Sequence, residues 1–384
     1  ILEKAVRLAK IRHDIEVDLS NLPHPDPKTF EMLSQGLTFG VFQLGSSGMT
    51  RYLKELRPST IFDISAMVAL YRPGPMQFIP DYIARKHNPK LISYLDPARE
   101  RILNRTYGIL VYQDDLLIIA HDLAGYSWAE VDKFRKAVGK KIPAEMAKQK
   151  EKFIKGCMAT SGWSEAKATQ IWTWIEPFAA YGFNKSHSAS YALVGYQTAY
   201  MKANFPVEFM AAVMTAESGD EEKIYAAVEE CKKMGIAVLP PDVTESFGDF
   251  TVIDDHRIRF GLRAIKNLGS DVVRKIIDCH KSNIKFTNLE EFLMHCYTKN
   301  LNKKSWEALV KSGAMDKFGN RSQLLASTEH VLDFLREHFK ETNQGQNSLF
   351  GSSLQIGRLR LKENIAPANA QEILGWEKEH LGLF

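Results

Sequence analysis

The chain has few cysteines, no long hydrophobic run and almost no excess charge of either sign. Its four cysteines, Cys157, Cys231, Cys279 and Cys296, show no Cys-x-x-Cys spacing, so neither a zinc site nor a disulfide framework is supported. No apolar run is long enough to span a bilayer, and no signal peptide opens the sequence. These absences favour a cytoplasmic protein with reduced, packed thiols and no membrane partner.

The composition is that of an ordinary globular protein. Of its 384 residues, 45% are hydrophobic and 25% are charged, with a net charge of +4. Helical patterns separated by short Gly and Pro breaks run from residue 28 to about residue 217, and they predict a mainly α fold. Two β-like runs, at 250–253 and 257–260, flank Asp254-Asp255, which we interpret as the turn of a small hairpin.

A short polar segment, Tyr-Gly-Phe-Asn-Lys-Ser-His-Ser at 181–188, lies between an apolar run at 172–180 and a predicted apolar helix at 191–205. Gly182 and Asn184 suit a turn, and Ser186 or Ser188 is expected to cap the helix that follows. A helix N-terminus offers free N–H donors and a positive dipole end. The segment therefore predicts an anion site for phosphate, with a capped helix start as the alternative.

A local excess of positive charge supports the anion site. Residues 132–155 carry acidic side chains only at Asp132, Glu145 and Glu151, and a cluster of this kind binds polyanions. We expect Gly139 and Pro143 to interrupt the helix, leaving Arg135-Lys136 at a helix end. The alternative is a solvated helix face. The basic residues are Lys133, Arg135, Lys136, Lys140, Lys141, Lys148, Lys150, Lys152 and Lys155.

These two segments together resemble the fingers of bacterial DNA polymerase III alpha subunits, the C-family replicative polymerases. Further segments match that family in the same order and cover essentially the whole chain. They are Gly-Val-Phe-Gln-Leu at 40–44, Ala-Leu-Tyr-Arg-Pro-Gly-Pro at 69–75, Thr-Tyr-Gly-Ile-Leu-Val-Tyr-Gln at 106–113, Pro-Val-Glu-Phe-Met-Ala-Ala at 206–212 and Val-Leu-Pro-Pro-Asp-Val at 238–243.

The resemblance assigns the nucleotide site. It implies that a group of cations neutralises the triphosphate and that a second group forms the wall facing the nucleotide. Lys136 stands where the family often has a second arginine, and lysine keeps the charge without the bidentate geometry. The second group includes a histidine that could also donate a proton toward the leaving pyrophosphate. The cations are Arg135, Lys136, Lys140 and Lys141, and the wall is Tyr181, Asn184, Lys185 and His187.

Two further segments are predicted to bind DNA. Arg72, in a turn rich in proline and glycine, could face a phosphate or the template, or be a surface arginine. Residues 261–280 resemble a helix-hairpin-helix module, whose turn offers backbone N–H groups to a DNA phosphate. Asn267 replaces one of the usual hairpin glycines and Gly269 is retained, so we assign Lys266 and Gly269 as DNA contacts. The alternative is a purely structural helical hairpin.

A polar segment near the C-terminus resembles a linker with a clamp-binding peptide. Residues 341–353 are polar and rich in Gly and Ser apart from Leu349-Phe350. Residues 346–350, Gln-Asn-Ser-Leu-Phe, are similar to the pentapeptide by which the family holds the sliding clamp, which implies clamp binding through Gln346, Ser348, Leu349 and Phe350. The alternative is that the two apolar side chains fold back onto their own domain. Upstream, residues 301–315 and 323–339 predict two helices, the second with a core-facing stripe.

The family's catalytic aspartates have no counterpart here. That chemistry uses three palm aspartates holding two Mg²⁺ ions, but no Asp-x-Asp occurs in a strand-like context, and we interpret Asp114-Asp115 as a helix cap. The missing initiator Met and the apolar end at Leu383-Phe384 agree with an internal fragment. We assign no catalytic or metal-binding residue to the chain, which alone is expected to be inactive.

The resemblance predicts the domain order and the partners. The regions are the end of the palm and entry to the fingers (1–27), the fingers (28–245), the β-hairpin and helix-hairpin-helix region (246–340), the clamp-binding linker (341–355) and the start of a C-terminal region (356–384). The expected partners are primer–template DNA, dNTP, the sliding clamp and other holoenzyme subunits. The alternatives are a free-standing, non-catalytic DNA- and clamp-binding scaffold, or part of an error-prone paralogue.

Overall fold

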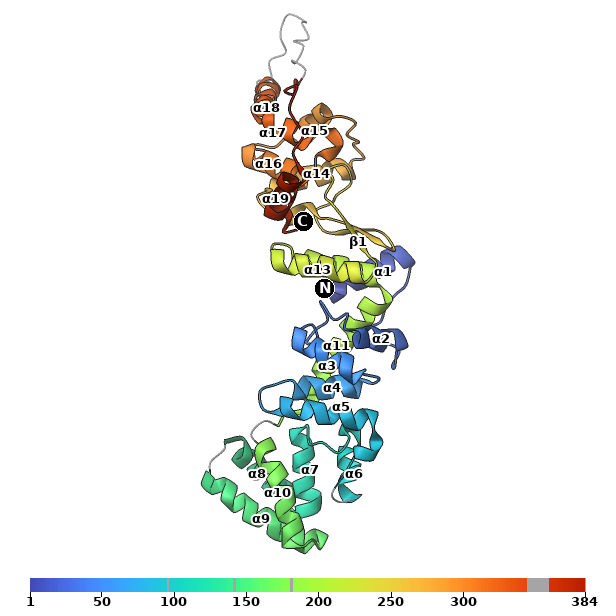
Figure 1. Cartoon of the computed structure of the whole chain (residues 1–384), viewed down its shortest axis with the longest axis vertical. Helices are drawn as coiled ribbons and strands as arrows, with labels where there is room; N and C mark the ends of the chain where they lie inside the picture. Colours follow the sequence, from blue (N-terminus) through green and yellow to red (C-terminus); the bar gives the residue numbers. More distant parts are fainter. Residues whose placement is uncertain (95–96, 141–142, 180–181, 344–358, 384) are drawn as a thin grey trace, which may run out of the picture. The chain divides into compact units, whose positions relative to one another are not determined.

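The computed structural model of the protein describes residues 1–94, 97–140, 143–179, 182–343 and 359–383. Across these ranges it has 19 α-helices and a single three-stranded sheet, which confirms the predicted mainly α fold (Figure 1). None of the described helices has the length and apolar composition of a membrane-spanning segment.

The chain forms two compact units, one of residues Asp18–Asn204 and the other of Ile1–Val17 together with Phe205–Phe384. The two units are defined by the tertiary contacts within the chain. The predicted functional regions follow the family's organisation, and their boundaries stay predictions.

The described residues of the unit Asp18–Asn204 form ten α-helices, which we number as in Figure 1. Short 3₁₀ turns lie between several of them, and Asp26 caps α2 through the Thr29 N–H at 3.0 Å. The helices are α2 (Pro27–Gln35), α3 (Ser47–Leu56), α4 (Ile61–Leu70), α5 (Ile79–His87), α6 (Pro97–Leu103), α7 (Gln113–Ala124), α8 (Trp128–Lys140), α9 (Pro143–Ser161), α10 (Glu165–Ala179) and α11 (Lys185–Asn204).

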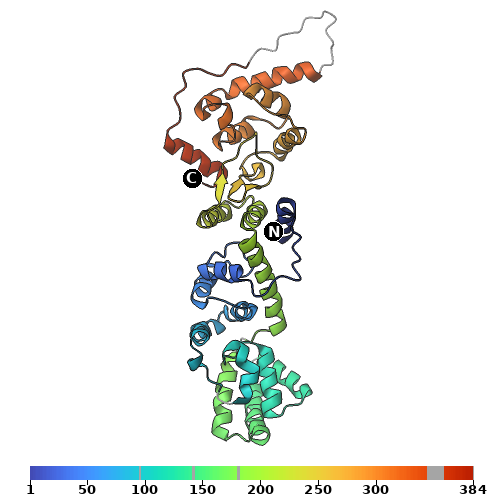
Figure 2. The same cartoon turned by 90° about the vertical axis from the view of Figure 1, so that its right-hand side faces the viewer.

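Two hydrophobic cores organise this unit. In the first, α2 to α5 pack with α11 around buried side chains such as Leu33, Met67 and Tyr196, and we call it the α4–α11 cluster. Figure 2 shows α11, in yellow-green, beside the blue helices of this cluster. In the second, the α7–α10 cluster, those four helices pack around Phe134 and Trp172. The chain passes between the cores at Tyr112 and returns at Phe183, where the two residues form an isolated parallel bridge.

Helix α11 begins earlier than the sequence predicts. It starts at Lys185 rather than Tyr191, and its cap is Asn184, whose Oδ1 accepts from the His187 N–H at 2.8 Å. The expectation of a cap at Ser186 or Ser188 is wrong, because both residues lie inside the helix. Ser188 is fully buried and donates its hydroxyl to the Ser65 carbonyl at 2.6 Å.

Two further boundary predictions are wrong. Gly139 does not end α8, which continues to Lys140, so Arg135 and Lys136 lie within the helix. A single glycine costs a helix only about 1 kcal/mol relative to alanine. The acidic pair Asp114-Asp115 is not a cap, because it occupies the first turn of α7 and the N-cap is Tyr112, which makes no side-chain capping bond.

The second unit combines nine helices with a small sheet. Asp220 caps α13 through the Lys223 N–H at 3.2 Å. The helices are α1 (Leu2–His13), α12 (Pro206–Ala216), α13 (Glu221–Lys233), α14 (Ser270–Lys281), α15 (Leu289–Cys296), α16 (Lys303–Lys311), α17 (Arg321–Ala326), α18 (Thr328–Asn343) and α19 (Ala370–Leu381).

The sheet adds one strand to the predicted hairpin. The hairpin strands are β2 (Thr251–Asp254) and β3 (Arg257–Arg259), and β1 (Ala237–Leu239) pairs parallel to β3, giving the order β1-β3-β2. The turn is therefore confirmed, although Asp254 belongs to β2 and the adjoining ladder carries a register shift.

The predicted C-terminal helices are shorter than the sequence patterns. The helix expected at 301–315 is α16 alone, and the run at 323–339 divides at the buried Ser327 into α17 and α18. The predicted core-facing stripe is confirmed on the described side chains of both pieces, since Leu324, Val331 and Leu335 are buried.

Candidate nucleotide-binding surface and helix-hairpin-helix segment

The polar segment at 182–188 is fixed to the first turn of α7. The Lys185 backbone N–H donates to Asp114 Oδ2 and its ammonium donates to Asp115 Oδ1, both at 2.8 Å. The Asp115 side chain is only 1% exposed, whereas the Lys185 side chain is 42% exposed. The loop therefore holds one cation at the surface on an immobile carboxylate.

The environment of Asp115 is unusual for an ion pair. Burial raises the pKa of its carboxyl, and the bond from Lys185 opposes that shift. Its second oxygen, Oδ2, is buried and has no hydrogen-bond partner among the residues described. Lys185 also lies with its ammonium 5.3 Å from the centre of the Tyr112 ring. Loss of Lys185 would leave a buried carboxylate without a counter-charge.

Phe183 brings a second cation to the same surface. The Arg72 guanidinium lies 3.8 Å from the centre of the Phe183 ring, in a cation–π contact. His187 packs edge-on against the same ring, with centroids 5.3 Å apart, and its ring lies 4.2 Å from that of Tyr191. The structure thus places Arg72 and His187 against the Phe183 ring and Lys185 beside the Tyr112 ring, with Asn184 as the helix cap.

Buried hydroxyl groups hold the start of α11 against α4. Tyr112 donates its hydroxyl to Ser65 Oγ at 2.9 Å, and the Ser65 and Ser188 hydroxyls are 3.1 Å apart. Burial raises the pKa of Tyr112 to about 12. Beside this contact lies a cavity of about 220 Å³, lined by Lys185 and Tyr112 together with Arg105 and Phe62. Arg105 and Lys185 therefore line the same cavity, and the Arg105 guanidinium lies 4.6 Å from the centre of the Phe62 ring.

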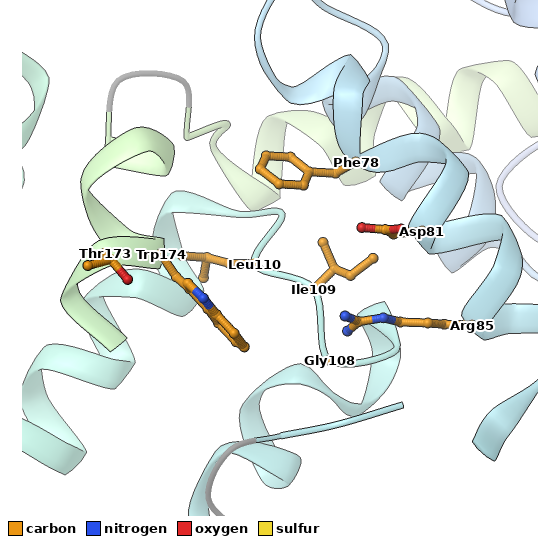
Figure 3. Close-up of a pocket in the computed structure, with 8 residues that line it drawn as sticks. All are labelled: Phe78, Asp81, Arg85, Gly108, Ile109, Leu110, Thr173 and Trp174. Carbon is orange, nitrogen blue, oxygen red and sulfur yellow. The ribbon is translucent and has the colours of Figure 1, made fainter. Parts of the chain in front are cut away.

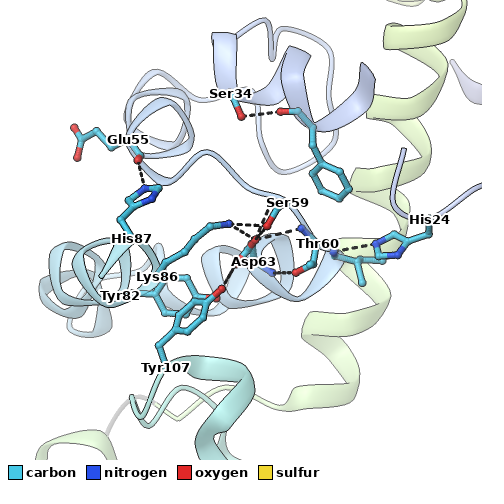
Figure 4. A network of polar contacts seen from close by, with 12 residues as sticks. His24, Ser34, Glu55, Ser59, Thr60, Asp63, Tyr82, Lys86, His87 and Tyr107 are labelled. Atoms are coloured by element: carbon cyan, nitrogen blue, oxygen red, sulfur yellow. Dashed lines mark hydrogen bonds and ion pairs between the residues drawn. The ribbon is translucent and has the colours of Figure 1, made fainter. Parts of the chain in front are cut away.

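A polar network centred on Asp63 fixes the neighbouring turn (Figure 4). The buried carboxylate accepts from the Lys86 ammonium at 2.5 Å and from the Tyr82 and Tyr107 hydroxyls at 3.3 and 3.2 Å. It also accepts from the Ser59 and Thr60 N–H groups ahead of α4. Burial, with the nearby Asp63 charge, raises the pKa of both tyrosines. The network ties α4, α5 and the turn at Tyr107 together.

The other predicted triphosphate ligands lie on α8. Arg135 and Lys136 are exposed and form ion pairs with Asp132 at 2.9 and 2.7 Å. Lys140 is the last residue of α8, with a side chain outside the described set, and Lys141 and Tyr181 also lie outside the described residues. The structure describes no hydrogen bond, ion pair or ring contact between Arg135 or Lys136 and the group around Phe183.

Other lysines of the basic run have acidic partners nearby. Lys148 and Lys155 pair with Glu145 and Glu151 on the same helix, and Lys152 reaches Glu130 of α8 at 2.5 Å. That hydrogen bond, followed by those from Ser127, lowers the pKa of Glu130 to about 2. This pattern is typical of the alternative interpretation of the run, a solvated helix face.

The helix-hairpin-helix segment adopts a tight turn before α14. Asn267 has φ of 69°, so it takes the left-handed conformation expected of a hairpin glycine, whereas Gly269 has an ordinary φ of −69° and open space where a Cβ would be. Lys266 pairs with Glu221 at 2.8 Å, and its N–H donates to the His380 carbonyl at 2.9 Å. Only a single 3₁₀ turn, Leu262–Ala264, precedes the hairpin.

The residues predicted to bind the clamp, Gln346, Ser348, Leu349 and Phe350, lie outside the described residues. Sequence reasoning missed Asp115 and Phe183 as supports of the loop. The available signal was the Asp-Asp pair at 114–115, but its partner is 70 residues away. Within the described ranges, no three His, Cys, Asp or Glu side chains gather to hold a metal ion.

Comparison with known proteins identifies the family. The finger-domain model of the bacterial DNA polymerase III alpha subunit matches residues 1–161, and a helix-hairpin-helix motif model matches residues 235–324. The chain is similar to the DNA polymerase III subunit alpha of Thermus aquaticus, with 43% identity over 100% of this chain and 31% of that protein.

Two further DNA polymerase III alpha subunits are similar to the chain over almost its whole length. The corresponding subunit of Borreliella burgdorferi is 41% identical over 95% of the chain, and that of Escherichia coli is 40% identical over 96%. Both alignments cover 32% of the relative, so the chain spans about a third of the length of these proteins. Because the matches extend over both compact units, the chain belongs to the family of bacterial DNA polymerase III alpha subunits.

Proposed function

We propose that this chain is the fingers and the DNA- and clamp-binding part of a template-directed DNA polymerase. It would position the incoming dNTP and the primer–template for nucleotidyl transfer. The observation that carries the proposal is the surface around Phe183, where Lys185 and Arg72 present two cations beside the N-terminus of the 20-residue helix α11. An array of fixed cations at a helix N-terminus suits a polyphosphate.

Lys185 would bind the triphosphate without leaving Asp115. An ammonium group has three N–H donors, and one is directed at Asp115 in this structure. The others remain available to phosphate oxygens on the exposed side. Since withdrawing the ammonium would leave a buried carboxylate unpaired, which is costly, Asp115 would act as a fixed support that sets where Lys185 meets the phosphates.

The other predicted nucleotide ligands would act on the same triphosphate as Lys185. Arg135, Lys136, Lys140 and Lys141 would neutralise further triphosphate charge, and His187 would donate a proton toward the leaving pyrophosphate. We place the Mg²⁺ ions of the reaction on palm aspartates that we do not assign to this chain. When bound there, the ions would activate the primer hydroxyl and neutralise charge on the leaving group.

The test uses the intact polymerase subunit with Lys185→Ala and Arg135→Ala variants. Each should raise the apparent KM for dNTP or lower kcat in primer extension, since each removes a cation from the phosphates. Lys155→Ala is the matched control, because this lysine belongs to the same basic run and, like Arg135, pairs within its own helix, but it is not among the predicted triphosphate ligands. Unchanged steady-state and single-turnover kinetics in both test variants would refute the assignments and favour the non-catalytic scaffold.

Clamp binding through the linker at 341–355 belongs to the same proposal. Burying two apolar side chains would contribute roughly 1.5–3 kcal/mol each, enough for a transient tether. We expect Leu349→Ala/Phe350→Ala to abolish calorimetric binding of the chain to the sliding clamp. Leu374→Ala, at an exposed leucine of α19, should leave it intact. Equal binding by the double variant and the wild type would remove the linker from the proposal.

A further inference from the structure

Arg105 is a cation that the function proposed above does not use. It lies in the 3₁₀ turn Asn104–Thr106, and together with Lys185 it lines the cavity of about 220 Å³ beside α4 and α11. We propose that this cavity holds the pyrophosphate released by nucleotidyl transfer, with Arg105 and Lys185 as its two cations. The inference rests on the proposed function, because that transfer joins the primer oxygen to the α-phosphorus of dNTP and breaks the bond from this phosphorus to the pyrophosphate oxygen.

The charges that line the cavity have one sign. Its described lining residues include two cations and no carboxylate. Two helix N-termini also border it, since Ile61 and Phe62 begin α4 and Lys185 begins α11, and a helix N-terminus favours an anion. Apart from the Ser65 and Tyr112 hydroxyls the remaining wall is apolar, and a wall of low dielectric concentrates the field of the cations. The cavity is therefore suited to a small anion with several charges.

The Arg105 guanidinium is held in place without the use of its N–H groups. It lies 4.6 Å from the centre of the Phe62 ring, in a cation–π contact, and among the described residues it forms no hydrogen bond or ion pair. A guanidinium has five N–H donors, whose arrangement matches the oxygens of a phosphate group. Lys185 directs one of its three donors at Asp115. Both cations therefore keep donors for a ligand in the cavity.

The volume of the cavity favours the released product over the whole substrate. Sites for small molecules measure about 300–1,000 Å³, and this cavity is smaller. Pyrophosphate lacks the base, the sugar and the α-phosphate of dNTP. Because Lys185 also belongs to the proposed triphosphate site, the leaving pyrophosphate keeps one cation as it enters the cavity and gains Arg105 as the second.

Another cavity of the unit Asp18–Asn204 lacks this charge pattern. It has a volume of about 330 Å³ and is bordered by α5 and α10, and Figure 3 shows Asp81 and Arg85 on α5 as its charged residues. An anion bound there would lie beside the Asp81 carboxylate, and Arg85 already donates an N–H to the Tyr107 carbonyl at 3.1 Å. Of these two cavities, the one at Arg105 is therefore the better site for pyrophosphate.

The experiment titrates sodium pyrophosphate, without divalent metal ions, into the 384-residue chain by calorimetry. The wild type should bind with a Kd of about 1 mM or lower. Arg105→Gln should weaken binding by about tenfold or more, as expected for the loss of a charged donor, and Arg105→Lys should retain part of the affinity. Arg51→Gln is the matched control, because Arg51 makes the same kind of contact, 5.0 Å from the centre of the Tyr52 ring, but does not line the cavity.

Primer extension by the intact subunit separates the released product from the bound substrate. Arg105→Gln should raise the inhibition constant of added pyrophosphate by about tenfold and should raise the KM for dNTP much less. Equal changes in these two constants would place Arg105 in the substrate site and overturn the inference. So would an absence of pyrophosphate binding by the wild type, or equal Kd values for Arg105→Gln and Arg51→Gln.

Lys185→Ala distinguishes a failure of this inference from a failure of the proposed function. If Lys185→Ala raises the KM for dNTP but Arg105→Gln binds pyrophosphate as the wild type does, the proposed function stands and the cavity is not a pyrophosphate site. If Lys185→Ala and Arg135→Ala leave the dNTP kinetics unchanged but Arg105→Gln weakens pyrophosphate binding, the cavity is a pyrophosphate site and the assignment of the triphosphate ligands fails.

Discussion

Among the side chains of the α4–α11 cluster, Asp63 is the one whose neutralisation should lower the free energy of unfolding most. Its carboxylate is 1% exposed, and the paired Lys86 side chain is 10% exposed. The same carboxylate accepts the N–H groups ahead of α4 and the hydroxyls of Tyr82 and Tyr107 (Figure 4). The perturbation is Asp63→Asn, which keeps the shape of the side chain and removes the negative charge.

The magnitude follows from burial. Breaking a buried ion pair by removing one partner costs about 3–5 kcal/mol, since the other charge is left without compensation. Asparagine can still accept some of the N–H and O–H bonds, so we expect about 3 kcal/mol. In a unit of this size each 1 kcal/mol shifts Tm by roughly 2–4 °C, so Asp63→Asn should lower Tm by about 6–12 °C.

The assay is thermal unfolding of the whole chain followed by circular dichroism and calorimetry. Asp132→Asn is the control, because Asp132 also pairs with cations but its side chain is 46% exposed, and exposed pairs contribute about 1 kcal/mol or less. Adding Lys86→Met to Asp63→Asn should recover part of the loss, since it removes the orphaned charge. A Tm for Asp63→Asn equal to that of Asp132→Asn would refute this reasoning.

Two further predictions concern the loop. Asp115→Asn in the intact subunit should raise the KM for dNTP by up to about fivefold with little change in kcat, because the half-exposed ion pair with Lys185 contributes about 1 kcal/mol or less. Burial raises the pKa of Tyr112 to about 12, above its value of about 10 in the unfolded chain. The stability from keeping this phenol neutral is therefore complete below about pH 10 and is lost as the pH rises to about 12. Urea unfolding across this range should show a shallower decline for Tyr112→Phe than for the wild type, and equal slopes would contradict the assignment.

Some helix starts depend on one local contact. Asp26 and Asp220 each cap the helix that follows, through the N–H groups of Thr29 and Lys223. The start of α11 was wrong because Asn184, Ser186 and Ser188 are all good capping residues. The choice between them depends on Ser65, which engages the Ser188 hydroxyl across 123 residues of sequence.

The candidate site was predicted in its residues but not in its arrangement. The loop at 182–188 and Arg72 were predicted separately, the first as part of a nucleotide site and the second as a DNA contact. Their meeting at Phe183 depends on packing between α4 and α11, which no local pattern encodes. Asp115 was misinterpreted for the same reason, since an acidic residue before an apolar run has the same local sequence whether it caps a helix or pairs with a distant lysine.

Lys185 has no described contact with Arg135 or Lys136, yet the packing around α7 explains how all three could bind one ligand. Lys185 is bonded through its backbone and its side chain to the first turn of α7. Arg135 and Lys136 lie on α8, which packs against α7 within one hydrophobic core. Both groups are thus held against α7, Lys185 by hydrogen bonds and Arg135 and Lys136 through the packing of α8. Pre-positioned charges of this kind stabilise a polyanion without the cost of ordering them on binding.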